Sequence, residues 1–228
     1  MKLDLSQLIQ AIIRGDHNAV SVAIQAEPEL VVQASATGAA RDNADDFFFP
    51  EIGHYLYVGD TPLHLAAAAF QHEIADLLLR HGANCHARNR RGAEPAHYAA
   101  DTNHWNPVAQ AATLVRLLEA GADPNATDRS GVAPLHRAAR TRSAAAVRAL
   151  LAHGANPRQP NRSGGTPLLL ALQTTGRGGS GSDRAKAQQL AIVQLLLEHG
   201  ARTEDLDRKH QAFLQAVLAE RCSPASRS

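Results

Sequence analysis

The sequence predicts an all-α solenoid built from repeated helix–turn–helix units. Four segments align with one another: GDTPLHLAA (59–67), GAEPAHYAA (92–100), GVAPLHRAA (131–139) and GGTPLLLAL (164–172). Each is followed by a leucine-rich segment that ends in glycine, at Gly82, Gly121, Gly154 and Gly200. Self-similarity at a regular spacing indicates stacked units, because one such unit cannot bury its own apolar face alone.

The spacing of the repeated residues defines the length of the unit. Pro62, Pro95, Pro134 and Pro167 are 33, 39 and 33 residues apart, and the four glycines are 39, 33 and 46 apart. A 33-residue unit with insertions fits both series.

The residue types predict two helices in each unit. A threonine before proline, as in Thr61-Pro62, places a capping hydroxyl before a residue suited to the first helical position. Alanine pairs allow close helix contacts, and the leucines give the second helix a broad apolar face. The glycine that follows supplies the left-handed conformation that ends a helix.

These repeats resemble those of the ankyrin-repeat family. The resemblance rests on T-P-L-H-x-A-A, L-L-x-x-G-A-x-x-x-A and D/N-R-x-G, repeated in register over roughly residues 5–218. It implies a non-catalytic module that binds a partner protein through a concave face and its turns. The sequence departs from the pattern where Glu94 and Ala133 replace threonine, Leu169 replaces histidine and Leu172 replaces the second alanine.

We expect one domain over residues 1–220, followed by a flexible tail at 221–228. An N-terminal capping repeat spans 1–32 and an insertion spans 33–58. Four full repeats then cover about 59–88, 89–127, 128–160 and 161–206, and a truncated C-terminal cap covers 207–220.

The first insertion concentrates aromatic and acidic residues. It holds five of the eight Phe and Tyr side chains of the chain, namely Phe47, Phe48, Phe49, Tyr55 and Tyr57. These aromatics either pack back onto the first two repeats or form an exposed patch for a partner. A second insertion of six residues contains the only tryptophan, Trp105.

The third insertion is glycine-rich and lies within TTGRGGSGSDRAKA (174–187). Residues 176–181 match G-x-G-x-x-G, but a dinucleotide fingerprint needs a preceding strand and a βαβ unit. Here a predicted helix precedes the glycines. We expect a surface loop and keep two alternatives, a weak anion contact at free backbone N–H groups and, more remotely, a nucleotide-using enzyme.

The remaining chemistry predicts no cofactor, no metal and no catalytic residue. His64, His97 and His136 share one repeat position, where the resemblance implies hydrogen bonds between adjacent turns. Two cysteines far apart, Cys85 and Cys222, favour a reducing compartment, and no apolar run of 18 residues suggests a membrane span. We therefore expect a cytoplasmic protein, more readily a monomer than an oligomer.

Charge is unevenly distributed although the net charge is only +1. From Arg129 to Ser182 there is no Asp or Glu, whereas Asp42 to Asp60 holds five carboxylates and no Lys or Arg. Arginines that directly follow a turn Asp or Asn are expected to form a ladder on the turn tips, and Arg140 is expected to face the same concave side. The ladder comprises Arg90, Arg129, Arg162 and Arg208.

Three interpretations of this arginine strip stay open. The arginines are tolerated on exposed turns, or they recruit an anionic surface, or the acidic insertion pairs with them and occludes the groove. We predict binding of a protein with an acidic surface; nucleic acid along the strip is the alternative, less expected given a pI near 8.0 and few aromatics. The candidate partner-binding residues are Arg90, Arg91, Arg129, Arg140, Arg162 and Arg208, with Phe47, Phe48, Phe49 and Trp105 in second place.

Overall fold

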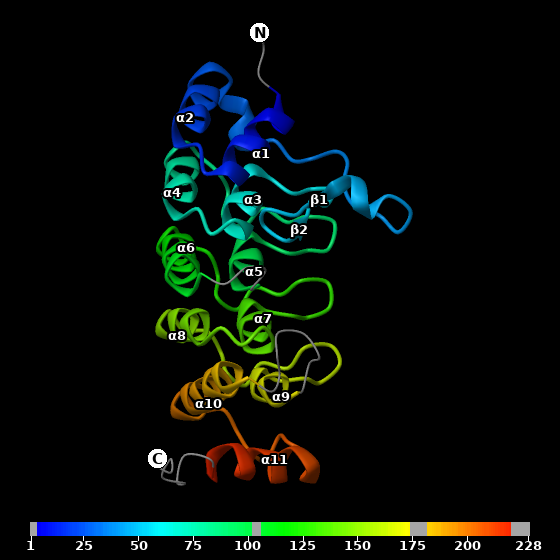
Figure 1. The fold of residues 1–228 in the computed structure, drawn as a ribbon, viewed down its shortest axis with the longest axis vertical. Coiled ribbons are helices and arrows are strands. Elements are labelled where there is room, and N and C mark those ends of the chain that lie inside the picture. Colours follow the sequence, from blue (N-terminus) through cyan, green and yellow to red (C-terminus); the bar gives the residue numbers. More distant parts are fainter. Residues whose placement is uncertain (1–3, 102–105, 174–181, 220–228) are drawn as a thin grey trace.

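The computed structural model describes residues 4–101, 106–173 and 182–219, and its helices stack in two rows along one long axis (Figure 1). The turns between repeats project from one row, which we call the inner row. It comprises α1 (Leu5–Arg14), α3 (Pro62–Ala68), α5 (Pro95–Ala100), α7 (Pro134–Arg140), α9 (Pro167–Leu172) and α11 (Arg208–Ala219). The outer row comprises α2 (His17–Ala26), α4 (His72–Arg80), α6 (Pro107–Glu119), α8 (Ala144–Ala152) and α10 (Asp183–Glu198).

The predicted all-α solenoid is confirmed. Helices α1 and α2 form the N-terminal cap, four helix pairs follow, and α11 packs on α9 as the C-terminal cap. The N-terminal cap ends in a short 3-10 helix, η1 (Pro28–Val31), and the first insertion contains a second one, η2 (Ala44–Phe47). The insertion also forms a hairpin of two-residue antiparallel strands, β1 (Phe48–Phe49) and β2 (His54–Tyr55), which the repeat pattern did not predict.

The core follows the repeated residues. The alanines of the inner helices, such as Ala67 and Ala139, are fully buried where neighbouring helices meet. Leucines of the outer helices, such as Leu78 and Leu150, are equally buried between the rows. Gly82 adopts a φ of +91° just after α4, as expected of a residue that ends a helix.

The shared histidine joins each repeat to the next, as the resemblance implied. In His97, Nδ1 accepts the backbone N–H of Glu94 at 3.1 Å, so Nε2 carries the proton and donates to the carbonyl of Val132 at 3.0 Å. His64 and His136 make the same pair of bonds. Replacement of threonine at positions 94 and 133 therefore leaves this bonding intact.

Candidate functional site

The turns between repeats are joined through their backbones. Each turn arginine donates its N–H to a carbonyl of the preceding turn. The N···O distances are 2.8 Å for Arg90 to Val58, 2.9 Å for Arg129 to Arg91 and 3.1 Å for Arg162 to Ser130. Three of the four arginines expected on the tips therefore form a continuous ladder.

Local sequence determines the shape of each turn. In the third repeat, Asp128 Oδ1 accepts the N–H groups of Ser130 at 2.8 Å and Val132 at 3.0 Å. Gly131 adopts a φ of +73°, and a Cβ there would lie 2.8 Å from the backbone nitrogen of Arg162. The glycine of D/N-R-x-G is thus required both by its conformation and by the next turn.

Arg129 and Arg162 are exposed on neighbouring turns. Among the ion pairs of the described residues, none joins a carboxylate to either guanidinium. These two arginines therefore present positive charge to solvent on adjacent repeats.

Arg90 and Arg91 differ from Arg129 and Arg162, because the first insertion contacts both of their side chains. Arg90 donates through Nη2 to the carbonyl of Ala39. The guanidinium carbons of Arg91 and Arg90 lie 4.3 Å and 5.6 Å from the centroid of the Tyr57 ring. Both contacts stabilise the insertion against the turn of the second repeat.

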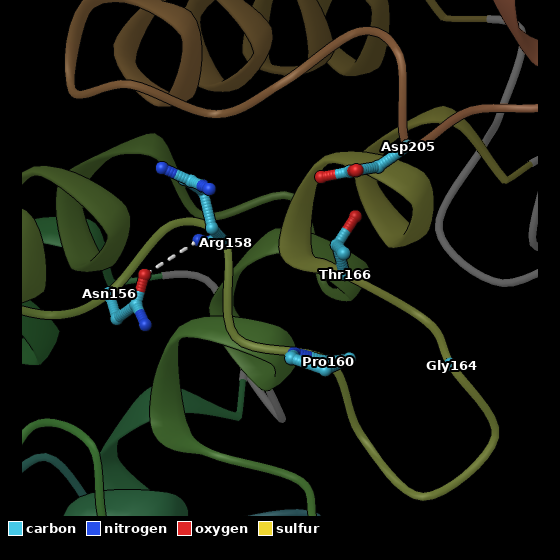
Figure 2. Close-up of a pocket in the computed structure, with 6 residues that line it drawn as sticks. All are labelled: Asn156, Arg158, Pro160, Gly164, Thr166 and Asp205. Carbon is cyan, nitrogen blue, oxygen red and sulfur yellow. Dashed lines mark hydrogen bonds between the residues drawn. The ribbon is translucent and has the colours of Figure 1, made fainter.

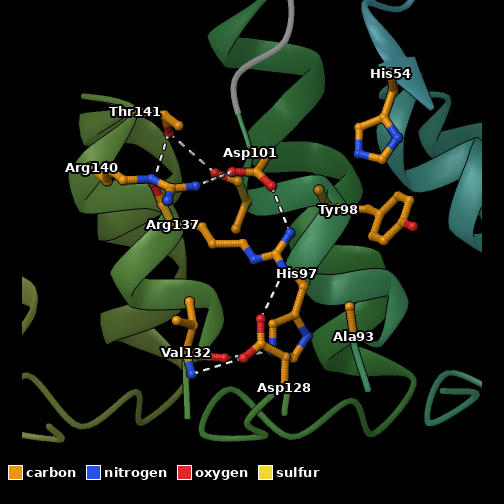
Figure 3. Close-up of polar contacts among 12 residues, drawn as sticks. His54, Ala93, His97, Tyr98, Asp101, Asp128, Val132, Arg137, Arg140 and Thr141 are labelled. Carbon is orange, nitrogen blue, oxygen red and sulfur yellow. Dashed lines mark hydrogen bonds and ion pairs between the residues drawn. The ribbon is translucent and has the colours of Figure 1, made fainter. Parts of the chain in front are cut away.

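The insertion also reaches the inner helices (Figure 3). The ring of His54 on β2 lies 4.3 Å from that of Tyr98 on α5, centroid to centroid. Ile52 and Leu56 are buried in the same core as the helices. Burial lowers the pKa of His54, which favours the neutral ring in this apolar contact.

This packing divides the inner face, by which we mean the surface shared by the inner helices and the turns. Every residue of α3 and α5 is buried. On α7 and α9, by contrast, Arg140 is exposed and Leu169 and Leu170 are half-buried. Among the described residues, the insertion thus covers the inner face over the first two full repeats, whereas Arg140, Leu169 and Leu170 keep that face partly exposed over the third and fourth, which we call the open half.

A buried carboxylate lies beneath the insertion. Asp60 is 0% exposed and accepts hydrogen bonds from the Tyr98 hydroxyl at 2.8 and 2.9 Å, from Asn89 Nδ2 at 2.9 Å and from the Tyr57 N–H at 2.7 Å. Burial and the neighbouring Asp60 raise the pKa of Tyr98 well above its usual value, so the phenol stays a donor. This network joins the insertion to the second repeat.

Arg137 links the second and third repeats (Figure 3). Its side chain is only 13% exposed, and it pairs with Asp101 Oδ2 at 2.6 Å and with Asp128 Oδ2 at 3.0 Å. Arg140 lies at the end of α7 and reaches Asp101 Oδ1 at 3.6 Å, with half of its side chain exposed. Arg140 is therefore partly neutralised, unlike Arg129 and Arg162.

A hollow of about 590 Å³ adjoins the fourth turn (Figure 2). Arg158 and Asp205 bring opposite charges to it, and Pro160 and Thr166 line it as well. Its polar, open character suits a surface contact better than a small-molecule site.

The aromatic candidates are not equivalent. Phe47 and Phe49 are half-buried against the core, whereas Phe48 is 39% exposed and lies 4.8 Å from the ring of Tyr55. Packing back onto the repeats thus describes most of these rings. Trp105 and residues 174–181 of the glycine-rich stretch lie outside the described residues.

One expectation needs correction, and one of the three open interpretations finds no support among the described residues. Arg208 is not on a turn tip: it is the first residue of α11, and Asp207 accepts the N–H of His210 at 2.8 Å as a helix cap. Residue 210 also replaces the glycine of D/N-R-x-G. The carboxylates of the first insertion, Asp42, Asp45, Asp46 and Glu51, make none of the ion pairs found among the described residues, so the insertion covers the inner face through apolar and ring contacts instead.

Sequence reasoning missed three residues that organise this face, namely His54, Tyr98 and Arg137. The available signal was the residue after the shared histidine, which is Leu65, Tyr98, Arg137 and Leu170 in successive repeats. The residue type at this position differs between repeats, which indicates that its side chain contacts different neighbours in each repeat.

The described residues contain no group of three His, Cys, Asp or Glu side chains arranged to hold a metal ion. Cys85 is a buried free thiol, and burial raises its pKa. Among the described helices, none has the length and apolar character needed to cross a membrane.

Comparison with known families agrees with the two-row architecture. A model of three ankyrin repeats matches residues 108–209, and a single ankyrin-repeat model matches residues 58–90, which together exceed half of the chain. The chain belongs to the ankyrin-repeat family. Ankyrin repeats are generally protein–protein interaction modules, and proteins of this family are typically non-catalytic scaffolds. No curated protein matches the sequence.

Proposed function

We propose that this ankyrin-repeat protein binds a partner with an acidic surface through the open half of its inner face. The observation that carries the proposal is the pair of exposed, carboxylate-free arginines on adjacent turns, Arg129 and Arg162. Guanidinium groups bind carboxylates in a bidentate manner, which suits recognition of an acidic protein surface.

The other candidate residues contribute to partner binding less directly in this proposal. Arg140 supports the contact from the end of α7, and Arg208 extends the positive charge onto α11. Arg90 and Arg91 act indirectly, because they are engaged by the insertion. Phe48 offers an exposed ring at the border of the covered half. A cytoplasmic location and a monomeric state belong to the same proposal.

Charge reversal tests the proposal. Affinity capture from the native cell is performed with the wild type and with the triple variant R129E/R140E/R162E. We expect the variant to lose the partner, and the wild-type complex to weaken with salt because exposed charges are screened. The control R80E/R116E/R148E makes the same charge change on the outer row, where all three side chains are exposed.

Capture that survives the triple reversal contradicts the proposal. Nucleic acid is the competing ligand for an arginine strip, and it predicts a gel shift with mixed DNA and RNA whose affinity falls steeply with salt. A shift abolished by R129E/R140E/R162E and retained by the outer-row control assigns the strip to nucleic acid instead.

A further inference from the structure

The first insertion demonstrates which chemistry a turn arginine of this stack accepts. In the covered half, Arg90 donates to the backbone carbonyl of Ala39 and faces the Tyr57 ring. Ala39 and Tyr57 belong to two stretches of the insertion, which are joined by a hydrogen bond of 2.7 Å from the Ala39 N–H to the Leu56 carbonyl. Arg129 and Arg162 hold the same turn position one and two repeats further on, since they make the same backbone bond to the preceding turn.

Resting on the partner binding proposed above, we infer that the open half binds an extended, acidic segment that carries aromatic residues. Its carboxylates pair with Arg129 and Arg162, and an aromatic ring stacks on a guanidinium as Tyr57 stacks beside Arg91. The segment continues along the stack from the place where the insertion ends.

The surroundings of the two arginines favour this chemistry. Asp101 and Asp128 pair with Arg137 rather than with Arg129 or Arg162, and Asp101 also pairs with Arg140. Asp205 lines the hollow beside the fourth turn, where Arg158 brings the opposite charge. Leu169 and Leu170 on α9 are half-buried, which leaves apolar surface for a ring. No Asp or Glu occurs between Arg129 and Ser182 to repel an acidic ligand.

The repeat spacing sets the pattern of the ligand. Packed helices lie about 8–10 Å apart. An extended chain in the polyproline II conformation advances about 3.1 Å per residue and has three residues per turn, so that every third side chain lies on the same side. A segment lying along the stack therefore passes one repeat for about every three residues. Carboxylates three residues apart match Arg129 and Arg162, and the hollow with Arg158 lies beside the end of this path.

Fluorescence anisotropy with the full chain tests the inference. The probe is the labelled peptide Asp-Tyr-Gly-Asp-Phe-Gly-Asp, compared with one in which alanine replaces both rings and one in which lysine replaces each Asp. We expect the first peptide to bind most tightly and the lysine peptide not to bind. The double variant R129E/R162E should weaken binding about tenfold or more, since it replaces attraction by repulsion at two sites.

The control R116E/R148E changes the charge equally on the outer row and should leave the dissociation constant within about twofold. Circular dichroism and urea midpoints verify that all variants fold. Equal binding by R129E/R162E, equal binding of the lysine peptide, or photo-crosslinking of the probe to α3 or α5 overturns the inference. If no peptide binds while partner capture is still lost in R129E/R140E/R162E, this inference fails and the proposed function stands.

Discussion

The ring of His54 lies 4.3 Å from the ring of Tyr98, and the Tyr98 hydroxyl donates to the fully buried carboxylate of Asp60. The Tyr98 side chain on α5 therefore packs against the insertion through its ring and donates a hydrogen bond to the buried Asp60 carboxylate through its hydroxyl. The division of the inner face into a covered and an open half depends on this contact, because Tyr98 occupies the position that Arg137 and Leu170 hold in the next repeats.

Replacement of Tyr98 by phenylalanine keeps the ring contact and removes the hydroxyl donor. Asp60 then loses one partner in a fully buried site, which costs about 1–3 kcal/mol of unfolding free energy. Urea unfolding measures the loss. The control Y55F alters a half-buried ring on β2 that has no hydrogen bond to Asp60, and an equal loss in both variants contradicts the assigned role of the Tyr98–Asp60 bond.

Removal of Arg137 should leave Asp101 and Asp128 without their shared cation. Breaking a buried pair on one side typically costs about 3–5 kcal/mol, so R137M should be strongly destabilised at pH 7. The matched variant R116M removes an exposed pair with Glu119 and should cost about 1 kcal/mol or less. Thermal or urea unfolding of the two variants makes the comparison.

The pH dependence of R137M follows from Asp128. Burial raises the pKa of this carboxyl, but the N–H groups of Val132 and Ser130 and the Arg137 guanidinium outweigh burial and hold it below its usual value of 3.8. Its contribution is thus present above pH 3.8 and is lost as pH falls through the lowered pKa. The stability gap between wild type and R137M should narrow in that acid range, and a constant gap contradicts the assignment.

The repeat pattern predicted most of the stack because its residues act within one unit or on the next. Proline, histidine and glycine positions followed from the period, and so did the turn positions of Arg129 and Arg162. Residues 33–58 have no period, so the placement of His54 against Tyr98 depends on contacts between distant segments. The prediction for Arg208 was wrong because Asp207-Arg208 matches only the first two residues of the D/N-R-x-G turn. His210 stands where that turn requires glycine.

Gly131 offers a test of the turn ladder itself. Alanine there is strained at a φ of +73°, and its Cβ would press on the backbone nitrogen of Arg162 at 2.8 Å. Gly154 has a φ of +84°, but nothing lies within 4 Å of the place a Cβ would take, so G154A carries the backbone strain alone. We expect G131A to lose about 1–3 kcal/mol more than G154A, measured by urea unfolding; equal losses would show that the next turn moves aside freely.

The lowered pKa of His97 predicts that the folded stack loses stability in acid. Burial first, and Arg137 next, lower its pKa from 6.5 to about 4 in the folded protein. Between these pH values the unfolded chain binds a proton that the folded chain does not, so stability is complete above pH 6.5 and falls as pH drops toward 4. The shift corresponds to about 3 kcal/mol.

The variant H97Q should be less stable than the wild type at pH 7, yet its unfolding free energy should fall less on acidification. The control H153Q changes an exposed residue after α8 and should keep the wild-type dependence of stability on pH. The test measures unfolding midpoints from pH 7 to pH 4. If the midpoint of H97Q changes with pH as steeply as that of the wild type, the acid sensitivity belongs to other groups.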